Sequence, residues 1–124
     1  MTTLYVGLKT GSDDLRSDCY ADFSVKVAGN PLLLTVEHFV GGQPKNSESF
    51  NKVDFPGTFD PSQIEFFQLL HVSVEQFPET PDNWDLTSIA VYVDPNGPSI
   101  AFAGPWRFTG NSRLFTFSPT PASG

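Results

Sequence analysis

Oxygen-bearing side chains gather in two short segments of the sequence and could together hold a divalent cation. The segments contribute six such residues, which are Asp13, Asp14, Asp18, Asp82, Asn83 and Asp85. Calcium takes about six to eight oxygen ligands, and two adjacent loops can supply them where a single strand cannot. We therefore expect a calcium site built from Asp13, Asp14, Asp18, Asp82 and Asp85. The alternative is a plain turn role, because Asp and Asn bond to their own backbone and tolerate left-handed angles.

Two tryptophans lie close to these acidic segments. Trp84 and Trp106 could stack on a sugar ring or sit at a membrane interface, because an indole is apolar with one polar group. The residues expected to contact a ligand are Trp84, Trp106, Asn46, Asn83 and Arg107. The alternative for Trp84 is structural, because the segment from Asp82 to Leu86 leads into a strand and the indole could close the end of a sandwich.

The residue types used for nucleophilic or zinc chemistry are sparse. His38 and His71 each lie in an apolar run, and Cys19 does not complete a zinc set of three or four ligands at a recognisable spacing. We expect both histidines to be core or sheet-surface residues and Cys19 to face inward. The sequence holds neither a G-x-S-x-G motif nor a glycine-rich phosphate loop. We therefore expect a protein that is not an enzyme.

The charge balance excludes one class of partner. Fourteen acidic residues against seven basic ones give a net charge of −7. This is the wrong sign for neutralising nucleic-acid phosphates, so we exclude nucleic acid. An acidic surface suits a basic partner, a divalent cation or simple solubility.

The length and the N-terminal sequence limit the number of domains and the cellular location that we expect. A chain of 124 residues fits one domain, and its lone Cys19 cannot form an internal disulfide. The N-terminus has no signal-peptide pattern, and no apolar stretch approaches the ~20 residues that cross a bilayer. We expect a protein without a transmembrane segment that is cytoplasmic or non-classically secreted.

Apolar residues alternate with polar ones in eight short segments separated by glycine, proline and asparagine turns. The expected strands span residues 4–9, 19–27, 32–39, 49–55, 64–77, 86–93, 99–103 and 113–117, with a helical turn at 61–65. Eight short strands with turns between them favour an eight-stranded antiparallel β-sandwich. We expect this all-β domain to span residues 1–118 and residues 119–124 to form a flexible tail.

Strand direction places the loops. If successive strands alternate in direction, loops 11–18, 40–47, 78–85 and 104–112 emerge at one end of the sandwich. Loops 28–31, 56–63 and 94–98 then emerge at the other end. The first group carries both tryptophans and six of the fourteen acidic residues. We therefore expect the working surface at that end.

Four short motifs resemble the PLAT/LH2 domain family. They are Lys9-Thr10-Gly11, the acidic start of a strand at Asp18-Cys19-Tyr20-Ala21-Asp22-Phe23, the strand Trp84-Asp85-Leu86-Thr87-Ser88-Ile89-Ala90-Val91-Tyr92-Val93, and Pro105-Trp106. The resemblance implies an eight-stranded sandwich of the PLAT, C2 or jelly-roll type with a non-catalytic role. It also implies calcium-assisted docking to membranes, lipids or a protein partner, with Asp13, Asp14 and Asp18 in the calcium-loop region. One departure is that Arg16 brings a cation close to the expected ion.

Three functions fit these observations. The first is a binding module whose loop end recognises a lipid headgroup or membrane surface, with calcium bridging acidic loops to anionic lipid. The second is a carbohydrate-binding lectin that stacks a tryptophan on a sugar. The third is an assembly or toxin-component protein that pairs with another chain, or with itself as an oligomer, through a sheet face or edge.

Overall fold

The structure is a computed structural model that describes residues 2–15, 19–72, 83–109 and 113–119. These residues form strands and one short 3-10 helix. The elements are β1 (Thr2–Thr10), β2 (Tyr20–Val27), β3 (Leu34–Val40), β4 (Glu48–Phe55), η1 (Pro61–Gln63), β5 (Ile64–Val72), β6 (Trp84–Tyr92), β7 (Ser99–Ala103), β8 (Trp106–Phe108) and β9 (Leu114–Phe117). Within the described residues, no helix is long and apolar enough to cross a membrane.

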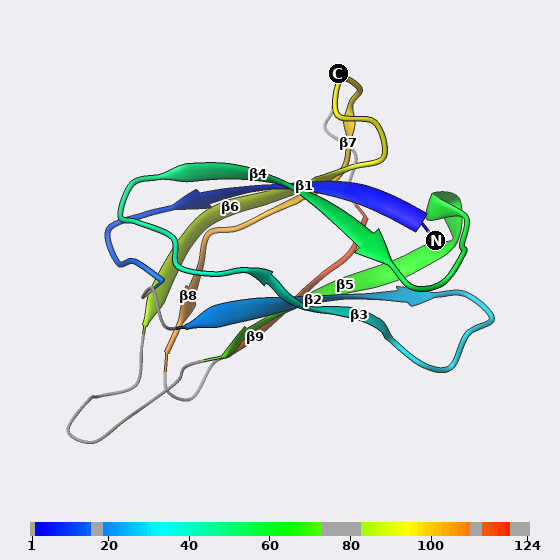
Figure 1. The fold of residues 1–124 in the computed structure, drawn as a ribbon, viewed down its shortest axis with the longest axis horizontal. Coiled ribbons are helices and arrows are strands. Elements are labelled where there is room, and N and C mark those ends of the chain that lie inside the picture. The colour runs from blue at the N-terminus through cyan, green and yellow to red at the C-terminus, as the bar shows by residue number, and fades with distance from the viewer. Residues whose placement is uncertain (1, 16–18, 73–82, 110–112, 120–124) are drawn as a thin grey trace.

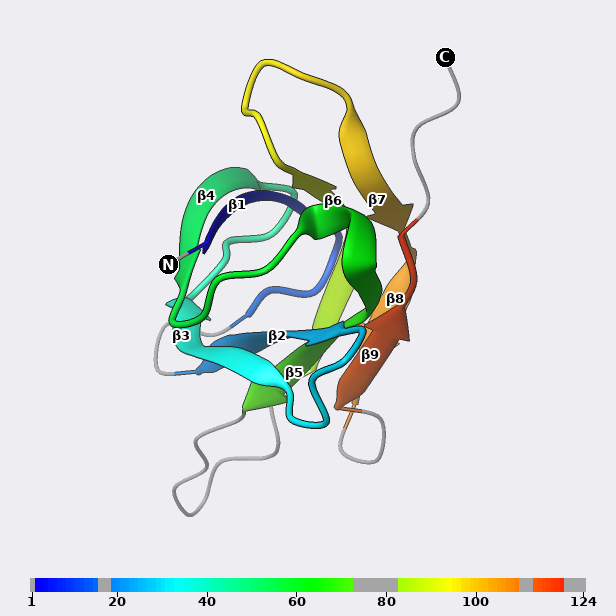
Figure 2. The same cartoon turned by 90° about the vertical axis from the view of Figure 1, so that its right-hand side faces the viewer.

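The strands form two antiparallel sheets that pack face to face, one above the other in Figure 1. One sheet has the order β4-β1-β6-β7, with β8 also paired to β6, and the other has the order β3-β2-β5-β9. β7 and β8 pair with successive parts of the same edge of β6, and Figure 2 shows them beside β9 along one side of the sandwich. The predicted all-β antiparallel sandwich is confirmed.

The alternating sequence pattern places the core between the sheets. In β1 the buried apolar side chains are Leu4, Val6 and Leu8, and in β2 they are Ala21, Phe23, Val25 and Val27. The ring of Phe23 lies at the centre, 5.4 Å from Phe39, 6.0 Å from Phe55 and 5.7 Å from Phe67 between centroids. Aromatic pairs at this spacing add to the free energy gained by burying apolar area.

The described residues form nine strands where eight were expected, and several bounds differ by one or two residues. β3 begins at Leu34 rather than residue 32, and β6 begins at Trp84 rather than residue 86. Residues 73–77 of the strand expected at 64–77 lie outside the described residues. The expected loop 104–112 contains the short strand β8. Three residues after Gly104-Pro105 are too few to show a period of two, so the sequence favoured a turn there. The helical turn expected at 61–65 is confirmed as η1.

Candidate functional site

The acidic loops meet at one end of the sandwich, as the direction of the strands predicts. Residues 11–15 follow β1 and lie between the turn before β4 and the start of β6. The amide of Gly11 donates to the carbonyl of Asp85 at 2.7 Å, and the amide of Asn46 donates to the carbonyl of Gly11 at 2.9 Å. At Leu15 the chain also forms a bridge with Gln43. Backbone hydrogen bonds therefore join segments that are far apart in the sequence.

The carboxylate of Asp85 holds the loop after β1. Its Oδ2 accepts hydrogen bonds from the amide and the hydroxyl of Ser12, both at 3.2 Å. A Cβ at Gly11 would lie 2.6 Å from the same oxygen, so glycine lets the loop pass this close to the carboxylate. Asp85 therefore fixes a turn, which is the alternative role considered for these residues.

Asp13 and Arg107 form an ion pair at the same end. The Nη2 of Arg107 donates to Oδ2 of Asp13 at 2.8 Å, and the side chains are 51% and 34% exposed. Arg107 stands opposite Asp85 in the register of β6 and β8, and the amide of Asp85 donates to the carbonyl of Asp13 at 3.0 Å. A guanidinium therefore lies against a carboxylate that was expected to bind calcium.

The described residues do not by themselves assemble a calcium site. Among them, no group of three or more His, Cys, Asp or Glu side chains is placed to hold a metal ion. Two of the five expected ligands, Asp18 and Asp82, lie outside the described residues, as does Arg16. Of the other three, Asp13 pairs with Arg107 and Asp85 accepts from Ser12, while Asp14 is half-buried in the same loop.

Neither tryptophan lies at a loop tip. Trp84 is the first residue of β6 and is fully buried, with its Nε1 donating to Thr10 Oγ1 at 3.1 Å and its ring stacked 5.2 Å from Phe108. The expectation that Trp84 contacts a ligand is therefore wrong, because its ring has no exposed surface, and it closes the end of the core instead. Trp106 lies in β8, where its half-buried ring stacks on Phe115 at 5.1 Å.

The remaining expected residues have local roles. Asn46 adopts a φ of 55°, a left-handed angle that suits asparagine in a turn, and Asn83 directly precedes β6. Cys19 and His71 are buried, as expected, and His71 lies edge-on to the Phe108 ring at 5.6 Å. His38 is exposed and lies against Tyr20, as expected for a sheet-surface residue.

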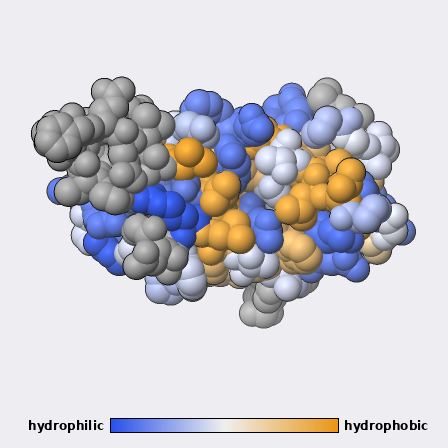
Figure 3. Space-filling model, turned by 90° about the horizontal axis from the view of Figure 1, so that it is seen from below, coloured by the Kyte–Doolittle hydropathy of each residue, from blue (hydrophilic) through white to orange (hydrophobic). Residues whose placement is uncertain are grey.

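Exposed apolar side chains lie at the opposite end of the molecule, in the loop between β2 and β3. Leu32 is 72% exposed and Leu33 is 40% exposed. The loop is shaped by Asn30, whose Oδ1 accepts from the amide of Leu32 at 3.0 Å, and by Gly29 with a φ of 83°. Figure 1 shows this cyan loop at the end away from residues 11–15, and Figure 3 shows hydrophobic surface toward that end. We call residues 31–33 the apolar tip.

No charged residue occurs between Ala28 and Leu34. The nearest cation on β2, Lys26, pairs with Glu65 at 2.9 Å. A cavity of about 260 Å³ lies behind the tip, between this loop and residues 57–63. The tip is thus an uncharged apolar projection on an acidic protein.

Comparison with solved structures places the fold. A crystal structure of an internal-deletion variant of LOX, with a further tryptophan substitution, matches with a TM-score of 0.65 and 13% identity over 95% of this chain and 16% of that chain. An anaerobic crystal structure of an internal-deletion LOX variant in complex with arachidonate matches with a TM-score of 0.64 and 14% identity, over 95% and 16% of the respective chains. The chain has a PLAT/LH2-type fold.

The matched part of these lipoxygenases is their N-terminal β-sandwich. This chain spans 16% of the LOX chains that it matches. No protein-family model and no curated protein matches the sequence. At this level of identity the likeness establishes the PLAT/LH2-type fold, which the short sequence motifs predicted.

The sequence contained a signal for the apolar tip that we interpreted as the start of a strand. Leu32 and Leu33 continue directly into the alternating residues of β3. Pro31 has no amide hydrogen to donate to a neighbouring strand, and the turn continues past it, so that β3 begins only at Leu34. Leu32 and Leu33 therefore belong to the turn rather than to the sheet.

Proposed function

We propose that the protein is a non-enzymatic module that docks on a lipid or membrane surface through the apolar tip. The observation that carries this proposal is the exposure of Leu32 and Leu33 on a loop that Asn30 and Gly29 hold in shape. Apolar side chains at the end of a rigid sandwich can enter the headgroup region while the core stays intact. The PLAT/LH2-type fold and the sparse catalytic residues support a binding module.

The expected interaction is weak and reversible. Burying a leucine side chain completely gains about 1.5–3 kcal/mol, so burying the exposed parts of Leu32 and Leu33 gains about 2 kcal/mol. No charged side chain in the tip adds electrostatic attraction to anionic lipid. The tip should therefore bind zwitterionic vesicles about as well as anionic ones.

The charge distribution also favours the apolar tip over the acidic end as the membrane contact. The protein carries a net charge of −7, and the loops around Asp13, Asp14 and Asp85 would be repelled by anionic headgroups. The tip can approach the same surface with no charge of its own. We therefore propose a membrane contact at the end opposite to the one that the sequence favoured.

Calcium assistance is a separate part of the proposal. If calcium binds at the acidic end, its ligands would come from Asp13, Asp14 and Asp85 together with Asp18 and Asp82, which lie outside the described residues. Such an ion would reduce the repulsion between this end and anionic lipid. Thermal unfolding of chelator-treated protein, with and without millimolar calcium chloride, tests this part. An unchanged melting temperature would remove calcium from the proposal and leave the tip unaffected.

Vesicle sedimentation tests the role of the tip. We expect a larger fraction of the protein than of the double variant Leu32→Ser, Leu33→Ser to sediment with phosphatidylcholine vesicles at high lipid concentration, because a gain of about 2 kcal/mol changes the partition constant about 30-fold. Leu114→Ser is the matched control, because Leu114 is 45% exposed on β9 and lies outside the tip. Loss of binding in the control variant, or equal binding by the double variant, would contradict the proposal. Circular dichroism confirms that each variant is folded.

A further inference from the structure

The outer face of the first sheet carries a row of four residues on adjacent strands, with two small residues in the middle and a large one at each end. The register pairs Phe50 of β4 with Gly7 of β1, Gly7 with Ala90 of β6, and Ala90 with Phe102 of β7. Two small residues therefore lie side by side between two phenylalanines. Adjacent strands are about 4.8 Å apart, so the outer Cα atoms of the row are about 14 Å apart.

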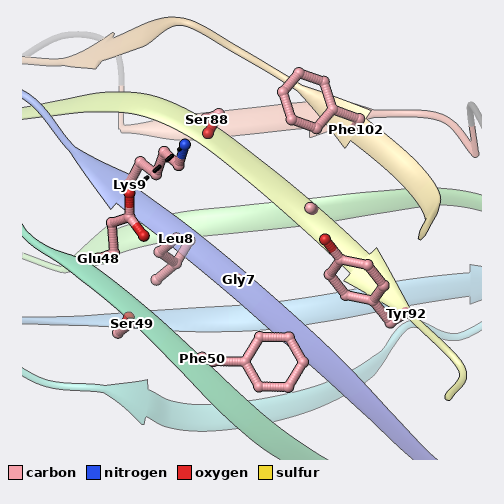
Figure 4. Close-up of a pocket in the computed structure, with 10 residues that line it drawn as sticks. Gly7, Leu8, Lys9, Glu48, Ser49, Phe50, Ser88, Tyr92 and Phe102 are labelled. Atoms are coloured by element: carbon pink, nitrogen blue, oxygen red, sulfur yellow. Dashed lines mark ion pairs between the residues drawn. The ribbon is translucent and has the colours of Figure 1, made fainter. Parts of the chain in front are cut away.

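This row forms the floor and walls of an open cavity of about 480 Å³. Gly7 and Ala90 make the floor, and Figure 4 shows Phe50, Tyr92 and Phe102 standing around it. A Cβ at Gly7 would lie 3.6 Å from Cδ1 of Phe50 and 3.9 Å from Cε1 of Tyr92, which is ordinary contact distance. A larger residue could therefore fit at this position without a clash. Glycine, which has no side chain, leaves the space above the sheet open. We call this cavity the aromatic slot.

The walls are exposed yet partly fixed. Phe50 is 54% exposed and Phe102 is 56% exposed. The Phe50 ring lies between Tyr5, stacked at 6.0 Å with an interplanar angle of 10°, and Tyr92 at 5.6 Å. A ring held by its neighbours loses little side-chain freedom when a ligand packs on it.

Polar groups lie at one end of the slot and carry no net charge between them. Lys9 Nζ and Glu48 Oε1 are 3.6 Å apart, and Ser88 and Ser49 also line the slot. Figure 4 shows the Lys9 and Glu48 side chains beside Ser88 and Ser49, away from Phe102. The lysine and the glutamate offer both hydrogen-bond donors and acceptors. The hydroxyl of Tyr92 adds another polar group.

We propose that the aromatic slot binds a pyranose ring of a neutral oligosaccharide. A neutral ligand suits the slot, because Lys9 and Glu48 balance one another, and hydroxyl groups on it can both donate to the glutamate and accept from the lysine. It must also present an apolar face to Phe50 or Phe102, as the C–H face of a pyranose does. An acyl chain fits poorly, because the slot is open to water along the sheet face and cannot enclose it.

Titration with neutral oligosaccharides tests the slot. Cellopentaose, maltopentaose and chitopentaose are added in turn to ¹⁵N-labelled protein, and the amide signals of Gly7 and Ala90 are followed. We expect at least one sugar to shift both signals in a saturable way. Phe102→Ala, which removes an exposed wall, should weaken that binding about tenfold or more. Gly7→Val should abolish it, because the new methyl groups occupy the floor of the slot.

Two controls separate this site from the rest of the molecule. Leu114→Ala removes a comparably exposed side chain from the other sheet and should leave sugar affinity unchanged. The Leu32→Ser, Leu33→Ser variant should also keep full sugar affinity, so failure of the lipid proposal leaves this one standing.

Three results would overturn the proposal. The first is no saturable shift with any of the three sugars. The second is equal affinity for Phe102→Ala and the unaltered protein. The third is a concentration-dependent dimer, detected by analytical ultracentrifugation, which Phe102→Ala disrupts but which none of the sugars dissociates. The slot would then hold a second copy of the chain rather than a sugar.

Discussion

Arg107 and Asp13 are 94 positions apart in sequence, and the guanidinium of one lies 2.8 Å from the carboxylate of the other. The pair joins the loop after β1 to β8. Because both side chains are partly exposed, we expect Arg107→Gln to lower the free energy of unfolding by less than about 1 kcal/mol. A double-mutant cycle with Asp13→Asn, measured by urea denaturation, gives the coupling energy. A coupling energy of zero would show that the contact does not stabilise the fold.

Arg107→Gln should also change the affinity of the protein for calcium. Removing the guanidinium takes a positive charge away from the Asp13 carboxylate, so calcium should bind Arg107→Gln more tightly than the unaltered protein if Asp13 is one of its ligands. Calorimetric titration with calcium chloride measures the difference, with Arg107→Lys as the control that keeps the charge. Equal affinity in the three proteins would exclude Asp13 from any calcium site.

Trp84 and Thr10 form a buried hydrogen bond between the first residue of β6 and the last of β1. Trp84→Phe leaves the Thr10 hydroxyl without this donor and removes part of a fully buried ring, so it should cost about 2–4 kcal/mol of stability. Thr10→Val leaves the indole Nε1 without its acceptor. Because each single change orphans one partner, the double variant should be about 1 kcal/mol more stable than the sum of the two changes predicts. Additive changes in urea denaturation would argue against a contribution from this hydrogen bond.

The sequence predicted the parts of the fold in which a pattern repeats. The alternation around Phe23 and Leu4 predicted their strands and the buried face of each, and alternating strand direction brought Gly11, Asn46 and Asp85 to one end. Turn residues bond locally, so their positions follow from nearby sequence.

The sequence did not predict the contacts that depend on register. Arg107 meets Asp13 only because the short strand β8 pairs with the start of β6. The row formed by Phe50, Gly7 and Phe102 likewise exists only once three strand pairings are known. Alternation shows that these residues face away from the core, but not which residues of neighbouring strands stand beside them.

Gly104 is the position at which we expect a single methyl group to be most costly. Its φ is 121°, and a Cβ there would lie 2.6 Å from the carbonyl oxygen of Thr87 on β6. Backbone rather than a flexible side chain is in the way, so Gly104→Ala should cost at least about 2 kcal/mol. Gly41→Ala is the control, because nothing lies within 4 Å of a Cβ at that exposed loop position. Thermal unfolding of both variants checks this, and equal melting temperatures would contradict it.

Asp60 caps η1 and should make a small, pH-dependent contribution to stability. Its Oδ1 accepts from the amide and the hydroxyl of Ser62, both at 2.9 Å, and these two hydrogen bonds hold the pKa of Asp60 below its usual value of 3.8. Because the folded pKa is the lower one, the stabilisation is complete above the pKa of the unfolded chain and is lost as the pH falls through the folded pKa.

Asp60→Asn isolates this charge, because asparagine keeps an acceptor for Ser62. The variant should melt at a lower temperature than the unaltered protein at pH 7, and the difference should vanish at a pH below the folded pKa, where Asp60 is also neutral. Side-chain carboxyl signals followed by nuclear magnetic resonance give the pKa directly. A pKa at or above 3.8, or a difference in melting temperature that is the same at both pH values, would contradict the role of these hydrogen bonds.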